Sequence, residues 1–279
     1  MIHSTFKFSS KDGLELFGRV WQTEEKHPKG IVNLIHGLGE HSGRYNHVAE
    51  ALTKAGYHMV GFDLRGHGLS EGNRGHTPGF DFFLDDISRF INESKKQLGE
   101  SLPSFIYGHS LGGLIVINYG MRFPENLAGV IATDPALKLS FAPPPVMFFI
   151  AKIMANLIPT FSSSNSLDVN ALARDAAVVK AYQDDVLVHD QISARHVVDM
   201  IHAGEDMLSR AEEWSLPLLL MHGSDDRITS SDASKTFAEK AGPEVTFVPW
   251  EGYYHEIHND LGKEKVIEKM ISWLDDRVK

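Results

Sequence analysis

The feature that most constrains this chain is the pentapeptide Gly-His-Ser-Leu-Gly at residues 108–112. It stands between an apolar, strand-like run at 104–107 and a helix-like run at 114–121. A serine at a sharp strand-to-helix turn has a strained backbone, and its hydroxyl projects out of the sheet. Glycines two positions to either side are needed because a Cβ there would collide with the closely approaching strand and helix. The pattern therefore predicts a buried strand that ends in an exposed serine, Ser110.

Composition limits the class of protein. The chain has 279 residues, 42% hydrophobic and 23% charged, which fits one soluble globular unit or a core with an insertion. It has no cysteine, so disulfides and thiol nucleophiles are excluded, and a reducing compartment is compatible. A formal charge of −10, with Lys and Arg scattered, argues against a nucleic-acid partner. The sequence thus favours an acidic globular protein that does not bind DNA or RNA.

No segment is typical of membrane insertion or export. The longest apolar stretch, 146–158, is too short and too polar to span a bilayer, which needs about 20 apolar residues. Residues 1–7 lack the charged-then-apolar organisation of a secretory signal. We therefore expect a cytoplasmic protein without a transmembrane segment.

Strand-like and helix-like patterns alternate over residues 1–135 and again from 217. The expected strands are 5–8, 14–21, 30–35, 57–62, 104–107, 127–133, 217–221 and 245–249, and helical patterns lie between most of them, among them 80–98 and 231–241. Strands separated by helices form mostly parallel sheets that are covered on both faces. The pattern predicts an α/β fold with a mostly parallel eight-stranded sheet flanked by helices.

The alternation breaks after Asp134 and Pro135. Residues 137–210 contain several short helical patterns and a segment rich in Phe, Met and Ile, but no strand of comparable strength. We interpret 137–210 as a helical cap inserted into a core formed by 1–136 and 211–279.

A serine hydroxyl is a poor nucleophile at neutral pH, so it needs a base and a group that orients the base. Asp225 and Asp226 follow the expected strand 217–221, and His255 follows the next strand. Functional groups of open parallel sheets collect beyond the carboxyl ends of the strands. The order Ser110, Asp226, His255 is the one expected for a catalytic triad on an α/β-hydrolase sheet, with Asp225 and the weaker Asp134 as rival acids.

Other polar features have plainer interpretations. His36 and His222 end strands and are expected to hold loops together by hydrogen bonds, and the Gly-rich segment 61–70 is interpreted as a structural turn. A metal site is disfavoured because no His-Glu-x-x-His pattern is present. The backbone N–H groups of Leu111, at a helix start, and Leu38, in the glycine-containing loop 36–39, are the expected oxyanion donors.

The chain resembles the monoacylglycerol lipase branch of the α/β-hydrolase family, also described as lysophospholipase-like. The matching segments are 36–45, 66–72, 108–113, 223–227 and 254–258, and the first, His-Gly-Leu-Gly-Glu-His-Ser-Gly-Arg-Tyr, is the most discriminating. The resemblance implies that Asp226 rather than Asp225 is the acid and that Leu38 is the second oxyanion donor. It also places Glu40, Arg44 and His258 near the glycerol end of a substrate. The alternative for these three is a buried polar network that braces the oxyanion loop.

The resemblance implies a serine hydrolase that cleaves monoacylglycerols to fatty acid and glycerol through an acyl-enzyme, with no metal or organic cofactor. In the cap, Phe148, Ile153 and Met154 are expected to bind the acyl chain, and the cap to make transient contact with a membrane or lipid surface. A broader carboxylesterase or lysophospholipase remains an alternative, as does a non-catalytic binding protein of hydrolase fold. Ser110 stands where epoxide hydrolases and dehalogenases use aspartate, so these are excluded.

Overall fold

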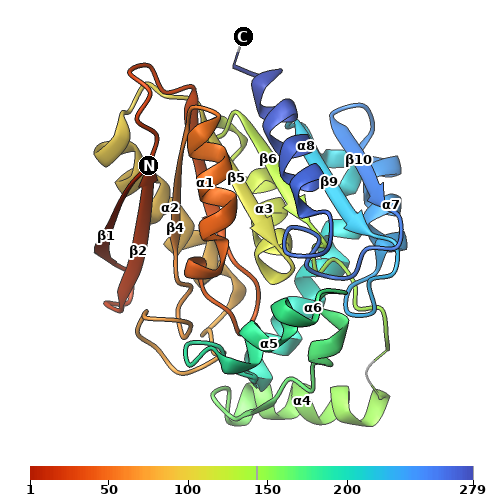
Figure 1. Cartoon of the computed structure of the whole chain (residues 1–279). Helices are drawn as coiled ribbons and strands as arrows, with labels where there is room; N and C mark the ends of the chain where they lie inside the picture. The colour runs from red at the N-terminus through yellow and green to blue at the C-terminus, as the bar shows by residue number, and fades with distance from the viewer. Residues whose placement is uncertain (143, 279) are drawn as a thin grey trace.

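The computed structural model describes residues 1–142 and 144–278; Pro143, in the expected cap, and Lys279 lie outside the described residues. The strands of the central sheet are β1 (Ile2–Ser9), β2 (Glu15–Gln22), β3 (Gly30–Ile35), β4 (Tyr57–Phe62), β5 (Ser104–His109), β6 (Gly129–Thr133), β9 (Leu218–Gly223) and β10 (Val245–Trp250). Their order is β1-β2-β4-β3-β5-β6-β9-β10 (Figure 1). β2 pairs antiparallel with β1 and β4, and the pairs from β4 to β10 are parallel. The mostly parallel eight-stranded sheet is confirmed.

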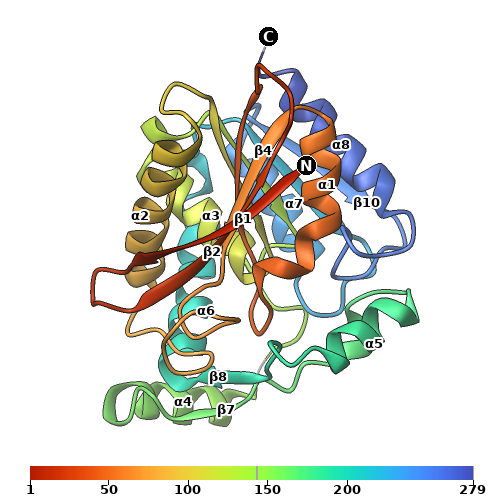
Figure 2. The ribbon, with the colours of Figure 1, turned by 60° about the vertical axis from the view of Figure 1, so that its left-hand side comes forward.

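Helices cover both faces of this sheet. They are α1 (Asn46–Lys54), α2 (Phe80–Leu98), α3 (Leu111–Arg122), α7 (Ser231–Ala241) and α8 (Lys263–Asp275), with short 3-10 turns η1 (Ser42–Tyr45), η2 (Pro124–Asn126) and η4 (Ala211–Glu213). In β3, Ile31 belongs to the apolar core that includes residues of α2, α3 and α7, whereas Val32 belongs to the core that includes residues of α1 and α8. Figure 2 shows α1 and α8 on one side of the sheet and α2 on the other. Alternating strand residues therefore build two cores, one on each face.

The segment between β6 and β9 lies at the end of the molecule opposite the C-terminus, as both views show. It contains α4 (Pro145–Leu157), β7 (Ser162–Ser164), η3 (Val169–Ala171), α5 (Ala176–Asp184), β8 (Gln191–Ser193) and α6 (Ala194–Ser209). β7 and β8 form a short antiparallel pair that the sequence pattern does not indicate. Met200 and Met207 of α6 pack into the core beside α2 and α3, so this helix joins the expected cap to the sheet.

One face of α4 packs against α6, through Ala155 and its neighbours, and the opposite face is exposed. Among the helices of residues 1–142 and 144–278, none has the length and apolar character needed to cross a membrane.

Candidate active site

Ser110 lies at the junction of β5 and α3, in the strained conformation that the pentapeptide predicts. Its φ is 54° and its ψ is −117°, which few non-glycine residues adopt. A Cβ on Gly108 would lie 2.2 Å from the carbonyl oxygen of Gly112, and one on Gly112 would lie 2.1 Å from that of Ile35. The two glycines are therefore required by close backbone approach.

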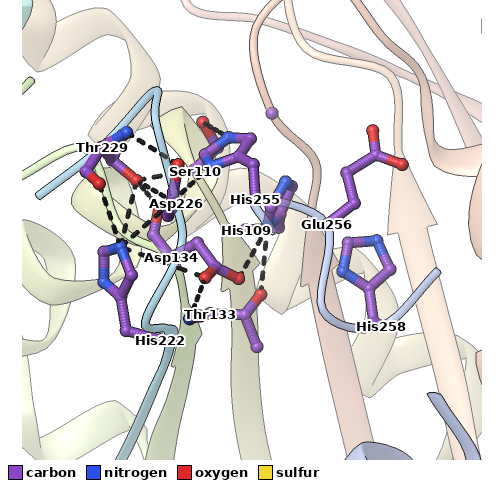
Figure 3. A network of polar contacts seen from close by, with 12 residues as sticks. His109, Ser110, Thr133, Asp134, His222, Asp226, Thr229, His255, Glu256 and His258 are labelled. Carbon is purple, nitrogen blue, oxygen red and sulfur yellow. Dashed lines mark hydrogen bonds and ion pairs between the residues drawn. The ribbon is translucent and has the colours of Figure 1, made fainter. Parts of the chain in front are cut away.

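Three loops bring Ser110, His255 and Asp226 into one hydrogen-bonded line (Figure 3). The Ser110 hydroxyl is 2.9 Å from Nε2 of His255, and Nδ1 of His255 is 2.7 Å from Oδ2 of Asp226. The Asp226 carboxylate is fully buried and the His255 ring nearly so. Because an ionised carboxylate only accepts, Nδ1 of His255 carries the proton and Nε2 is free to accept from the hydroxyl.

Asp226 is held by further donors on both oxygens. Oδ1 accepts from the backbone N–H groups of Ile228, at 2.7 Å, and Thr229, at 3.1 Å. Oδ2 accepts from the Thr229 hydroxyl, at 2.7 Å, and from Nε2 of His222, at 3.1 Å. The rival Asp225 is exposed, and its carboxylate contacts Ser224. Of the two carboxylates, Asp226 is therefore the one that bonds His255.

His222 and Thr229 are therefore parts of this site that sequence reasoning did not assign to it. The expectation for His222 was a loop-holding hydrogen bond, and its Nδ1 does bond Ser234 Oγ of α7, at 2.8 Å. Its other ring nitrogen, Nε2, donates to Asp226, so the same side chain also supports this carboxylate. The signal was spacing, since His222 precedes Asp226 by one tight turn and Thr229 follows it closely.

The electrostatics of the pair suit proton transfer. Burial acts to lower the pKa of His255, but the charge and hydrogen bond of Asp226 outweigh it, and the pKa is raised. Burial acts to raise the pKa of Asp226, but the charge of His255 and the hydrogen bond from His222 hold it well below its usual range. Asp226 stays ionised beside an imidazole that it makes more basic.

Asp134, the weaker rival, lies deeper in the same network. Its backbone has φ 48°, and Oδ1 accepts from the N–H of Gly223 at 2.8 Å. Burial and the neighbouring charge of Asp226 raise its pKa well above the usual range. Asp134, His222 and Asp226 could together hold a metal ion, since one ligand atom of each lies within 4.8 Å of the others. The Oδ2 atom of Asp226 already receives three hydrogen bonds, so the cluster works as a hydrogen-bond network.

Leu38 and Leu111, whose N–H groups are the expected oxyanion donors, line the same cavity as Ser110. Leu111 begins α3, where the first N–H groups have no intrahelical partner. The loop after β3 brings Gly37 close, since a Cβ there would lie 3.3 Å from Cβ of Ser110. Within residues 1–142 and 144–278, the N–H groups of Leu38 and Leu111 have no hydrogen-bond partner. The arrangement can bind an oxyanion on Ser110.

A cavity of about 880 Å³ extends from Ser110 into the segment between β6 and β9. Ser110, His255, Glu40 and Glu256 line its polar end, and the rest is mostly apolar. Among the cap residues expected to contact substrate, Phe148 and Met154 line this cavity.

Three expected substrate contacts do not line the cavity. Ile153 lies on the outer face of α4, where it is 41% exposed. His258 is buried behind the site and stacks on Tyr45, with ring centroids 4.7 Å apart. Arg44 is also behind the wall, where it forms ion pairs.

Arg44 builds the bracing network that the sequence left as an alternative. Its guanidinium bonds Oε2 of Glu40 at 2.7 Å and both oxygens of Glu256 at 2.7 and 2.8 Å. Burial acts to raise the pKa of Glu40, but the charge of Arg44 beside it lowers that pKa to about 2. Oε1 of Glu40 accepts from the N–H of Gly37 at 2.7 Å. The network therefore shapes the loop that presents Leu38.

The sheet, the strained serine and the hydrogen-bonded line define a serine hydrolase of the α/β-hydrolase class. The family model Hydrolase_4, described as serine aminopeptidase, S33, matches residues 26–262, so the chain belongs to that family. The expected fold and family are confirmed.

Individual proteins are similar to this chain over most of its length. A monoacylglycerol lipase of Mycolicibacterium smegmatis is 34% identical, over 97% of this chain and 96% of its own length. A crystal structure of the Paleococcus ferrophilus monoacylglycerol lipase has 37% identity and a TM-score of 0.86, covering 94% of this chain and 99% of its own. An uncharacterized abhydrolase domain-containing protein of Dictyostelium discoideum is 37% identical over 97% of this chain, which spans 28% of that longer protein.

Proposed function

We propose that the protein hydrolyses monoacylglycerols to fatty acid and glycerol, with Ser110 as nucleophile, His255 as base and Asp226 as the group that orients His255. The observation that carries the proposal is the cavity, which is lined by Ser110 and His255 at one end and by mostly apolar side chains elsewhere. A monoester of glycerol has the same division into a polar head and an apolar chain. The names of the relatives from Mycolicibacterium and Paleococcus support the same substrate.

The mechanism follows from the distances. Ser110 Oγ attacks the ester carbonyl while Nε2 of His255 takes its proton, and the imidazolium is stabilised by Asp226. The N–H groups of Leu38 and Leu111 bind the oxyanion. His255 then protonates the departing glycerol oxygen, and water repeats the sequence on the acyl-enzyme. In this proposal residues 137–210 act as the cap that binds the acyl chain through Phe148 and Met154.

The substrate proposal is tested by a chain-length series. Each additional methylene that is buried under the cap contributes about 0.8 kcal/mol, which is roughly fourfold in kcat/KM. We expect kcat/KM for monoacylglycerols to rise by this factor per methylene until the cavity is filled, and to exceed that for glycerol monoacetate by several hundred-fold or more. Diacylglycerols, triacylglycerols and lysophospholipids assayed in parallel serve as controls. A clear preference for acetate would contradict the proposal, and a preference for lysophospholipids would favour that alternative.

The proposal further includes a cytoplasmic location and a cap that touches a lipid surface transiently, and the outer face of α4 supports the lipid contact. Val146, Phe149 and Leu157 are each more than 60% exposed on this helix, although burying such side chains is favourable by about 1.5–3 kcal/mol each. None of the three lines the cavity.

Replacing Phe149 and Leu157 together by serine should therefore weaken cosedimentation with phosphatidylcholine vesicles by about tenfold or more. Hydrolysis of monomeric glycerol monoacetate should stay at the parental rate, because the cavity is untouched. Unchanged vesicle binding in the double variant would reject the lipid contact.

A further inference from the structure

One stretch of the cap forms hydrogen bonds with the loop that carries the catalytic histidine. The carbonyl oxygens of Ala171 and Leu172 accept from the N–H groups of His255, at 3.4 Å, and Glu256, at 2.7 Å. Arg174 then binds Asp260, whose carboxylate is fully buried, through its own N–H and through Nε, both at 2.8 Å. The histidine loop is therefore held from the cap side as well as by its own strand.

The same stretch continues through α5 and reaches the oxyanion loop. The N–H of His189 donates to the carbonyl oxygen of Gly39, next to Leu38, at 2.8 Å. Nε2 of His41 lies 2.8 Å from Oδ2 of Asp185. Backbone approach is close enough that a Cβ on Gly39 would lie 2.3 Å from the carbonyl oxygen of His189. These contacts fix the loop on both sides of Glu40.

The sheet itself does not join these two loops. The oxyanion loop follows β3 and the histidine loop follows β10, and β5, β6 and β9 lie between them in the strand order. Direct contact between the loops includes the stacking of Tyr45 on His258 and the ion pairs of Arg44, which bridges Glu40 and Glu256. Tyr182 of α5 covers the Arg44 guanidinium at 4.8 Å from its ring centroid. Residues 171–193, which we call the clamp segment, thus contact both loops and the ion pair between them.

We propose that the clamp segment is a positioning element that sets the place of the oxyanion loop relative to His255, with Arg174 and Asp185 as its two positioning residues. The inference rests on the proposed function, in which both loops must address one carbonyl group. A shift of about 1 Å between reacting groups can cost about 100-fold in rate.

The test uses the full chain and a substrate that does not need the acyl part of the cavity, p-nitrophenyl acetate. Asp185→Ala and Arg174→Ala each release one end of the clamp segment. We expect kcat to fall by about 10- to 100-fold in each variant, with KM within about twofold of the parent. The double variant should lose much less than the product of the two factors, because releasing either end already frees the loops. Arg174→Lys keeps a cation beside Asp260 and should recover most of the lost rate.

The matched control is Lys180→Ala. Lys180 lies on α5 within the clamp segment, is exposed, and pairs with Asp184 rather than with either loop, so its variant should match the parent. Thermal unfolding identifies any variant that does not fold, and Asp185→Ala, whose site is partly exposed, carries the test if Arg174→Ala unfolds.

The outcomes separate the positioning role of the clamp segment from the proposed function. If Ser110→Ala is inactive but folded Asp185→Ala turns over the acetate at the parental kcat, the positioning role is rejected and the proposed function stands. The positioning role is likewise rejected, without harm to the proposed function, if Lys180→Ala is impaired as strongly as Asp185→Ala. If Ser110→Ala keeps its activity, the proposed function fails and the positioning role fails with it.

Discussion

Ser110→Ala should lower kcat for a glycerol monoester by about six orders of magnitude, to the residual rate that binding and oxyanion contacts alone supply. The substitution removes the attacking oxygen and leaves the base with nothing to deprotonate. The backbone should keep its shape, because Ser110 N still donates to Thr133 O, at 3.0 Å, and Leu114 N to Ser110 O, also at 3.0 Å. Steady-state hydrolysis and circular dichroism of the purified variant provide the measurement.

A suitable control is Ser101→Ala, which changes an exposed serine in the turn before β5. This variant should hydrolyse the same ester at the parental rate. If Ser110→Ala retained more than about a tenth of parental activity, a loss far smaller than removal of a nucleophile produces, the assignment of the nucleophile would be wrong.

Asp226→Asn should lower kcat by about four orders of magnitude, because an amide can favour the wrong tautomer of His255. It should also move the acid limb of the pH–rate profile. Asp226 raises the pKa of His255, and the base acts only when it is neutral. Removing the charge lowers that pKa, so the residual activity should persist to lower pH than in the parent. Profiles of kcat/KM against pH for both proteins measure this shift.

Asp225→Asn is the matched control, one residue away and exposed. Its carboxylate contacts Ser224 and not the triad, so the expected change in kcat is less than about threefold, as for other surface substitutions. If Asp225→Asn were the more damaging change, the wrong carboxylate would have been assigned.

Much of the core could be predicted from local pattern. The bounds of β3, β4, α2 and α7 match the expected ranges, because each is a continuous apolar or amphipathic run that ends at a polar or glycine-containing turn. β7 and β8 could not be predicted this way. Ser162–Ser164 has no apolar alternation, and its pairing with Gln191–Ser193 depends on the path of the chain between β6 and β9.

The hydrogen-bonded line of Ser110, His255 and Asp226 could be predicted because chemistry and spacing act together there. Ser110, Asp226 and His255 come from strand ends, and parallel strands bring their carboxyl ends to one edge of the sheet. Arg44 and Ile153 show what the sequence alone could not predict. The family resemblance places Arg44 near the substrate. Only packing decides that its side chain lies between two glutamates behind the cavity wall. Composition likewise cannot tell which apolar side chains of α4 face inward, as Met154 does, and which face outward, as Ile153 does.

The central claim is that the hydroxyl at position 110 is activated by its neighbours, and covalent labelling by a fluorophosphonate tests it most directly. Unactivated serines, and a binding protein of the same fold, do not react with such reagents at low concentration. Mass spectrometry of the digested protein should find one adduct, on the peptide that contains Ser110, with labelling strongly reduced in His255→Ala. An unlabelled protein, or an adduct on another serine, would contradict the account.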